Sequence, residues 1–336
     1  MRASSRACWA NARSSSMDNN PVDTRPRVSV IIPAYNVEAY IERAIQSVLD
    51  QQNATVEVIV VNDASTDGTA AAITRIRDAR VGTITLPANL GPGGARNAGI
   101  AAATLPWISV LDGDDAFLPD RLARCLMRAK IIDADVVVDN LQVIREADKA
   151  EYPMFDPLPF SRLGTLTLAK FISGNRSFLG GAPTFGYLKP IFSAAFLRRH
   201  ALVYDTELRI GEDYLLMCEV LAKGALCAVE PTAGYNYTVR ATSISHRLTP
   251  ADVERIAAGD RKWLAHNKLD FAAAKAQKQR QHGIREALAF TRLVEAIKAR
   301  NTKAALQALA LWPPAVLQLW RPVWVRVRRV FGRVRK

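Results

Sequence analysis

The chain has 336 residues, and 45 Lys or Arg against 32 Asp or Glu give it a formal net charge of +13. Hydrophobic residues make up 49% and charged residues 23%, a globular composition that excludes a chain disordered along its whole length. No apolar run reaches the roughly 18 residues that span a bilayer, and four cysteines without paired metal spacing favour a reducing, cytosolic compartment over a disulfide scaffold.

The first 26 residues predict a disordered leader. Residues 1–16 are rich in Arg and Ser and lack the apolar core of a secretory signal. Met1 and Met17 are both compatible with the true start of the protein. We therefore expect the folded part of the chain to begin near residue 27.

Short β-branched runs alternate with helical patterns after residue 27. The runs predict strands at 28–33, 56–61, 81–86 and 107–111, and two of the intervening segments predict helices at 37–50 and 92–103. This alternation indicates parallel βαβ units in an α/β, Rossmann-like, doubly wound sheet. Ligands of such sheets bind beyond the carboxyl ends of the strands, which is where the polar clusters of this sequence fall.

The alternation weakens beyond about Asp139. The Pro- and Phe-rich stretch at 152–160 and the Gly-rich stretch at 174–186 are expected to be connecting or lid loops. Residues 248–311 are rich in Ala, Lys and Arg and predict a helical extension. Cys125 and Cys218 fall on apolar helix faces and are expected in the core.

The positive charge lies at the two ends of the chain. Residues 1–27 hold five Arg and two Asp, and residues 296–336 hold ten Lys or Arg and no acidic residue, so the body between them is neutral. A nucleic-acid enzyme usually carries a basic face on its folded body. This distribution of charge therefore argues against a nucleic-acid partner. It favours a neutral folded body that binds an anionic surface through one basic end of the chain.

Residues 312–336 predict a basic amphipathic tail. Apolar side chains recur there every three or four residues, and the cations fall mainly between them. The apolar residues are Trp320, Trp324, Val327, Phe331 and Val334. A basic helix with aromatic side chains on its apolar face tends to lie in a membrane interface. We expect the tail to bind an anionic membrane surface; a packed or disordered tail and a nucleic-acid contact are the alternatives.

The sharpest chemical feature is Asp112-Gly-Asp-Asp115, directly after the predicted strand at 107–111. Three carboxylates within four residues repel one another unless a cation joins them. Hard oxygen donors suit Mg²⁺ or Mn²⁺, which commonly bridge to phosphates. The segment therefore indicates a metal site, and an acidic turn before the next helix is the alternative.

Two further polar features lie near the same sheet edge. Asp63 follows the second strand, where a carboxylate can accept a hydrogen bond from a base or ribose; an Asx turn is the alternative. The glycine-rich segment 91–99 begins a helix and contains Arg96, a combination that can bind an anion. It lacks the G-x-G-x-x-G spacing of a dinucleotide site.

A second acidic pair, Glu212 and Asp213, heads a predicted helix. Carboxylates at a helix N-terminus stabilise the helix, which is one explanation for the pair. The other explanation is a general base at a site that needs one.

Together these motifs resemble the family 2 glycosyltransferases, which have the GT-A fold, a Rossmann-like doubly wound mixed sheet. The matching segments are 28–36, 60–68, 89–99 and 111–115, in this order. The resemblance covers roughly residues 27–245 and implies a catalytic domain at 27–247. The second half, with its segments 186–191, 204–205, 210–215, 235–240 and 243–247, is similar to succinoglycan-type exopolysaccharide glucosyltransferases.

The resemblance implies a role for each matching residue. It makes Asp213 the catalytic base and Asp114 the ligand of a Mn²⁺ or Mg²⁺ ion that grips a diphosphate. It assigns the nucleotide to Pro33, Tyr35, Asp63, Arg96 and Asp112. It also places four residues near the sugar, the acceptor or the diphosphate: Asp115, Glu212, His246 and Arg247. For His246, an ordinary surface histidine is the alternative.

The implied activity is that of an inverting, metal-dependent hexosyltransferase. It would move a hexose from a UDP-sugar to a hydroxyl of a growing, lipid-linked exopolysaccharide or glycan, as a peripheral protein on the cytoplasmic face of the plasma membrane. The finer similarity implies glucose, although galactose and an N-acetylhexosamine fit the same motifs.

Two other functions are considered. A metal-dependent nucleotidyltransferase would carry a Gly-rich loop with a basic residue after the first strand, where this chain has Pro33-Ala-Tyr-Asn36. A non-catalytic nucleotide-sugar-binding scaffold would be free to lose Asp112, Asp114 and Asp213, which are all present.

Overall fold

The computed structural model describes residues 24–176, 178–179, 183–240 and 248–318. Nearly all of the predicted leader, most of the predicted tail, and His246 and Arg247 lie outside the described residues. Within the described part of the chain, no helix combines the length and apolar character needed to cross a bilayer.

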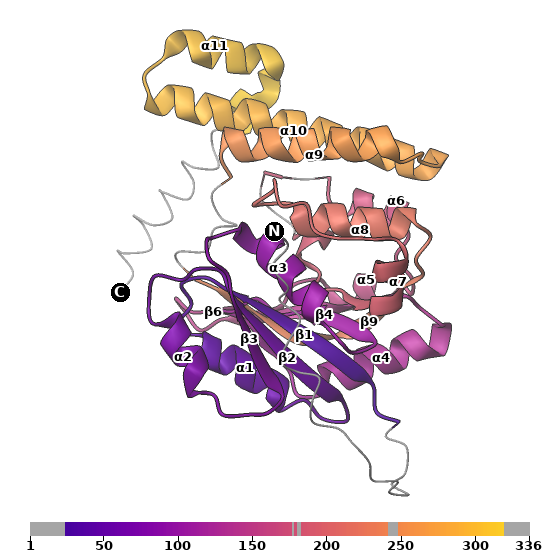
Figure 1. Cartoon of the computed structure of the whole chain (residues 1–336). Helices are drawn as coiled ribbons and strands as arrows, with labels where there is room; N and C mark the ends of the chain where they lie inside the picture. Colours follow the sequence, from indigo (N-terminus) through magenta and orange to yellow (C-terminus); the bar gives the residue numbers. More distant parts are fainter. Residues whose placement is uncertain (1–23, 177, 180–182, 241–247, 319–336) are drawn as a thin grey trace, which may run out of the picture.

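One mixed sheet lies at the centre of the described structure (Figure 1). Its strand order is β3-β2-β1-β4-β8-β6-β9-β5, with β7 paired to β6. The strands are β1 (Arg27–Ala34), β2 (Thr55–Asn62), β3 (Val81–Thr85), β4 (Trp107–Val110), β5 (Ala116–Phe117), β6 (Val136–Arg145), β7 (Glu151–Pro153), β8 (Ile191–Ser193) and β9 (Cys227–Val239).

The N-terminal half of the sheet confirms the predicted strands. β1 pairs in parallel with β2 and β4, and β2 pairs in parallel with β3. Val30, Ile31 and Ile32 of β1 are all fully buried, because helices cover both faces of the sheet and the central strands are apolar on both sides. The second half makes the sheet mixed, since β8 runs antiparallel to both β4 and β6, whereas β9 is parallel to β6.

Helices lie on both faces of this sheet. Figure 1 shows α1 (Ile41–Leu49), α2 (Thr69–Arg75) and α4 (Arg121–Ile132) on one face, and α3 (Gly91–Ala102), α6 (Leu168–Ser173) and α8 (Glu212–Ala222) on the other. The shorter elements are α5 (Pro157–Ser161), α7 (Ala194–Arg199) and the 3-10 turn η1 (Phe185–Tyr187). Cys125 of α4 and Cys218 of α8 are buried, which confirms their predicted place in the core.

The stretch at 152–160 is not the simple loop that its composition predicts. It contains the end of β7 and most of α5. The Asp156 side chain accepts the Leu158 N–H and caps α5, which begins at Pro157. The buried Asn140 side chain binds the N–H and C=O of Phe155, so this apolar segment is held against the sheet.

The C-terminal extension is helical, as expected. It consists of α9 (Pro250–His266), α10 (Phe271–Lys298), α11 (Thr302–Leu311) and the 3-10 turn η3 (Pro313–Gln318), and it forms an outer layer beyond α8 (Figure 1). The first residues of the predicted tail belong to this layer, because Ala315 is buried and Trp312 meets His282 of α10 edge-on.

A buried ion pair joins the extension to the sheet domain. Arg280 of α10 donates to Asp260 of α9 over 2.8 Å and to the Asn175 carbonyl over 2.8 Å. Its guanidinium lies 3.5 Å from the ring centroid of Tyr214 in α8. One cation therefore holds α8, α9, α10 and the segment after α6 together.

Arg280→Met leaves the Asp260 carboxylate buried without its main partner. We expect the free energy of unfolding to fall by about 3–5 kcal/mol, measured by urea denaturation. Arg292→Met is the matched control, since Arg292 also joins α10 to α9, through Glu254, but on the exposed surface. The control should lose less than about 1 kcal/mol, and equal losses in the two variants would contradict the prediction.

Candidate active site

The carboxyl ends of β1, β2 and β4 meet at one edge of the sheet, as parallel strands must. Asp63 follows β2 there, and its carboxylate accepts the Leu90 N–H over 2.7 Å. Its own N–H donates to the Ala34 carbonyl at the end of β1. Pro33 is half-buried in β1, whereas Tyr35 just beyond it is 48% exposed. Asp63 therefore ties the ends of two strands to the segment before α3.

The glycines of α3 bring this helix directly onto β1. A Cβ on Gly99 would lie 2.3 Å from Cγ2 of Ile31, so a larger residue would push the helix away from the strand. This close approach places Arg96, one turn before Gly99, at the sheet edge with its side chain almost fully buried.

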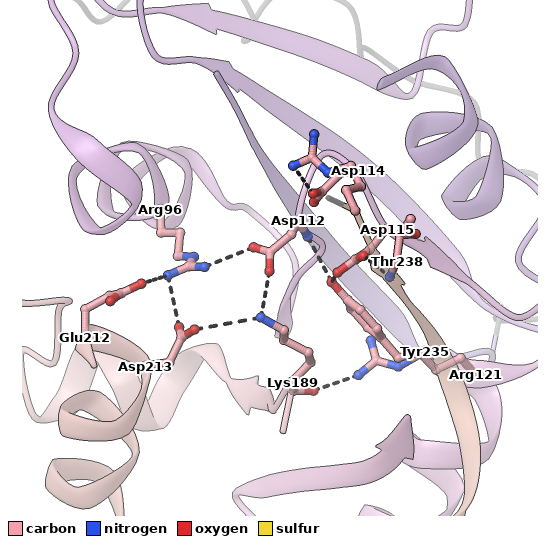
Figure 2. A network of polar contacts seen from close by, with 11 residues as sticks. Arg96, Asp112, Asp114, Asp115, Arg121, Lys189, Glu212, Asp213, Tyr235 and Thr238 are labelled. Atoms are coloured by element: carbon pink, nitrogen blue, oxygen red, sulfur yellow. Dashed lines mark hydrogen bonds and ion pairs between the residues drawn. The ribbon is translucent and has the colours of Figure 1, made fainter. Parts of the chain in front are cut away.

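Four charged side chains form a closed ring at this edge (Figure 2). Arg96 binds Asp112 through Nη2 over 2.9 Å and Asp213 through Nη1 over 3.0 Å. Lys189 Nζ lies 2.6 Å from Oδ2 of Asp112 and 3.8 Å from Oδ2 of Asp213. Positive and negative groups alternate around the ring. These four residues are called the charge ring below.

The charge ring stabilises the ionised form of Asp112. Burial acts to raise the pKa of this carboxyl, but the charges of Lys189 and then Arg96 outweigh it and hold the pKa well below the usual range. Asp112 is therefore a carboxylate with two fixed cations around it.

Glu212 and Asp213 head α8 together but differ in exposure. The Glu212 side chain is 7% exposed and binds Arg96 Nη1 over 2.6 Å, whereas the Asp213 side chain is 25% exposed. Burial and then the charge of Asp213 raise the pKa of Glu212, against the opposing charge of Arg96. Asp213 is therefore the more accessible member of the pair, whereas Glu212 is almost fully buried against Arg96.

Asp114 and Asp115 occupy different environments. Asp114 forms an ion pair with Arg240 just after β9, and burial followed by the charge of Asp112 raises the pKa of its carboxyl. Asp115 is only 2% exposed; its carboxylate accepts Tyr235 Oη–H over 2.8 Å and the Thr238 N–H over 2.7 Å. Asp115 thus fixes β9 against the acidic segment, with both of its carboxylate oxygens bound by protein donors.

The donor set at Asp112 and Asp114 fits a divalent cation. Among the residues that the structure describes, no group of three His, Cys, Asp or Glu side chains could hold a metal ion by itself. Mg²⁺ in nucleotide sites is commonly held by one or two carboxylates together with substrate phosphates and water. The ionised form of Asp114 is disfavoured by burial and by Asp112, and a divalent cation held by Asp114 would offset that cost.

Sequence reasoning assigned no role to Lys189, Arg121, Tyr235 or Arg240. Lys189 and Arg240 stand in irregular segments, where a single cation has no periodicity that reveals its partner. Arg121 is fully buried in α4 and donates to Asp139 and to the Lys189 carbonyl. The position of Arg121 just after Pro119-Asp120 resembles an ordinary helix start, and only its burial shows that it is unusual.

Two curated relatives cover most of this chain. The succinoglycan biosynthesis protein ExoO of Rhizobium meliloti (strain 1021) is 44% identical over 94% of this chain and 90% of its own length. The succinoglycan biosynthesis protein ExoU of the same organism is 36% identical over 77% of this chain and 75% of its own length.

Solved structures share the fold. TarS 1-349 of S. aureus in complex with UDP superposes with a TM-score of 0.62 at 23% identity, over 86% of this chain and 81% of that one. The mannosyltransferase PcManGT of Pyrobaculum calidifontis in complex with GDP-Man and Mn²⁺ gives a TM-score of 0.58 at 20% identity, over 95% of this chain and 91% of that one. Both likenesses support the predicted GT-A fold with its helical extension.

The family model for glycosyl transferase family 2 matches residues 29–192, which hold the acidic segment, Arg96 and Lys189. The match and the two long relatives agree with the motifs seen in the sequence and favour a glycosyltransferase over the nucleotidyltransferase and non-catalytic alternatives. The chain therefore belongs to the family 2 glycosyltransferases and is a glycosyltransferase.

Proposed function

We propose that this glycosyltransferase is an inverting, metal-dependent hexosyltransferase of exopolysaccharide synthesis, which moves glucose from UDP-glucose to a hydroxyl of a growing, lipid-linked glycan. The observation that carries the proposal is the charge ring, because it joins the acidic segment after β4 to the partly exposed carboxylate of Asp213. Two further findings support it: the long relatives are named succinoglycan biosynthesis proteins, and TarS has been solved with UDP and with UDP-GlcNAc.

The donor side of the proposed site lies at the ends of β1, β2 and β4. Tyr35 presents an exposed ring on which a uracil can stack, next to Pro33. Asp63, whose Oδ1 accepts the Leu90 N–H, offers its other carboxylate oxygen to the uridine. Arg96 and Asp112 would lie next to the nucleotide near its diphosphate, and Asp114 would be the metal ligand.

Departure of UDP develops negative charge on the diphosphate. Mn²⁺ or Mg²⁺ held by Asp114 would neutralise that charge when bound. Arg96 adds a positive charge that the fold holds in place before the donor binds. Charges fixed in advance need no reorganisation during the reaction, so they stabilise the leaving group effectively.

The acceptor side is assigned to Asp213. A sugar hydroxyl is a weak nucleophile until a positioned base takes its proton, and Asp213 is the accessible carboxylate at the head of α8. In the proposed geometry the hydroxyl attacks the anomeric carbon on the face opposite the diphosphate. A single displacement then converts an α-linked donor into a β-glycoside.

The lipid-linked acceptor requires the enzyme to work at a membrane. In this proposal residues 27–247 are the catalytic domain, 248–311 are the extension, and the basic tail within 312–336 holds the protein on the cytoplasmic face of the plasma membrane. The proposal is supported by η3, which contains the first residues of this segment and packs on α10 and α11.

The test is UDP release from a panel of UDP-sugars with Mn²⁺ or Mg²⁺, with and without bacterial membrane lipids. We expect metal-dependent release from UDP-glucose that the lipids increase. Release from a different UDP-sugar alone would replace glucose as the donor. Failure of every UDP-sugar to bind to the folded protein would overturn the proposal.

Asp213→Asn removes the proposed base while it keeps the size of the side chain. We expect kcat to fall about 10²–10⁴-fold, because general bases contribute this much, with the Kd for UDP nearly unchanged in calorimetry. Glu219→Gln, also on α8, is the control and should keep wild-type kcat. Loss of UDP binding in Asp213→Asn would instead make Asp213 a structural residue.

Asp114→Ala removes the proposed metal ligand. We expect the stimulation of UDP release by Mn²⁺ or Mg²⁺ to disappear and metal-dependent UDP binding to weaken at least about tenfold, since the metal links carboxylate and diphosphate. Asp148→Ala, which alters an exposed carboxylate after β6, serves as the control. A variant that keeps its metal response would show that other groups bind the ion.

Deletion of residues 319–336 tests the tail. The cut is placed after η3 because Trp312 and Ala315 pack on the extension. We expect the shortened protein to lose binding to vesicles that contain anionic lipid, measured by sedimentation, because the deletion removes seven Lys or Arg. Unchanged binding would place the membrane contact elsewhere on the protein.

A further inference from the structure

Sheet topology brings Lys189 to the site. β8 runs antiparallel to β4, with Ile191 opposite Ser109. The residues before β8 therefore lie beside the residues after β4. Lys189 stands two positions before Ile191, and Asp112 stands three positions after Ser109, so the two side chains meet at the strand ends.

The ammonium of Lys189 contacts both halves of the proposed site. Its Nζ lies 2.6 Å from Asp112 on the donor side and 3.8 Å from Asp213 on the acceptor side (Figure 2). The side chain is only 10% exposed. Burial would lower the pKa of a lysine, but the charges of Asp112 and Asp213 outweigh it and raise the pKa of Lys189.

The backbone of Lys189 is also held. Arg121 Nη2 donates to the Lys189 carbonyl over 2.7 Å, and Arg121 itself is clamped by both oxygens of Asp139 at 2.8 and 3.0 Å. The same guanidinium lies 5.2 Å from the ring centroid of Tyr235, whose hydroxyl accepts the Asp112 N–H over 3.1 Å. One buried cation thus supports Lys189 and, through Tyr235, its partner Asp112.

Arg96 alone would not fix the distance between the two carboxylates. Its guanidinium binds Asp112, Asp213 and Glu212, so three negative groups share one positive charge on that side. Lys189 closes the ring from the other side. Without its charge, Asp112 and Asp213 would repel each other across the position where the donor and acceptor must meet.

We propose that Lys189 is a positioning residue of the transfer reaction: its ammonium holds Asp112 and Asp213 at the separation that lets the base face the donor. This inference rests on the proposed function. A displacement of the base by about 1 Å can cost about 10²-fold in rate without a comparable loss of binding. The expected signature is therefore a loss in kcat that exceeds the change in KM.

The test compares Lys189→Gln with Lys189→Arg in the full chain, by UDP release with the active donor and by calorimetry with UDP. We expect the Gln variant to lose about 10²-fold in kcat, with KM for the donor changed less than about fivefold. We expect the Arg variant, which keeps the positive charge, to retain at least about a tenth of wild-type kcat.

Lys223→Gln is the matched control, because Lys223 lies just after α8 in an exposed pair with Glu219. It should keep wild-type kcat and KM. If the Gln variant melts below the assay temperature, Lys189→Met, which keeps the aliphatic stem packed, replaces it as the neutral variant.

Two outcomes would overturn the inference while the proposed function stands. One is a wild-type protein that transfers sugar together with a neutral variant that keeps kcat within about threefold. The other is a folded Arg variant that binds UDP but is as inactive as the neutral one, since the charge would then not be what matters. Absence of UDP-sugar binding by the wild-type protein would contradict the proposed function itself.

Discussion

Carboxylates from distant parts of a chain share a small, partly buried site only when fixed cations offset their repulsion. The positions of α3 and β8 in this protein can be understood from that constraint. Asp112 and Asp213 stand about a hundred residues apart, and Arg96 and Lys189 join them from two sides. The glycines of α3 serve this arrangement because they let Arg96 approach the sheet edge. The antiparallel entry of β8 serves it because it delivers Lys189 to the same point.

Sequence patterns predicted the N-terminal half of the fold well because that half is built from local signals. Buried parallel strands are apolar on both sides, so β1 and β2 appear as hydrophobic runs that only Ser29 and Glu57 interrupt. The polar residues after each strand then fall at one edge without any knowledge of tertiary structure. The motifs around Arg96, Asp112 and Asp213 identified the family, and in the structure both carboxylates contact Arg96.

The C-terminal half of the sheet and the second cation were beyond sequence reasoning because they depend on pairing between distant segments. β8 has three residues, and its place between β4 and β6 leaves no periodic trace in the sequence. The role of Lys189 follows only from that pairing. Asp115 shows a related limit of sequence reasoning. Its position in the acidic segment suggests the same environment as Asp112 and Asp114, but in the structure β9 covers it and protein groups donate to both of its oxygens.

The helical extension also contacts the candidate active site, through the residue next to the proposed base. Tyr214 follows Asp213 in α8, and the guanidinium of Arg280 lies against its ring while binding Asp260 of α9. Since η3 packs on α10 and α11, the root of the basic tail and the helix that carries Asp213 belong to one continuously packed unit. In the proposed function, attachment of the tail to a membrane would therefore hold at that surface a packed unit that includes the helix carrying Asp213.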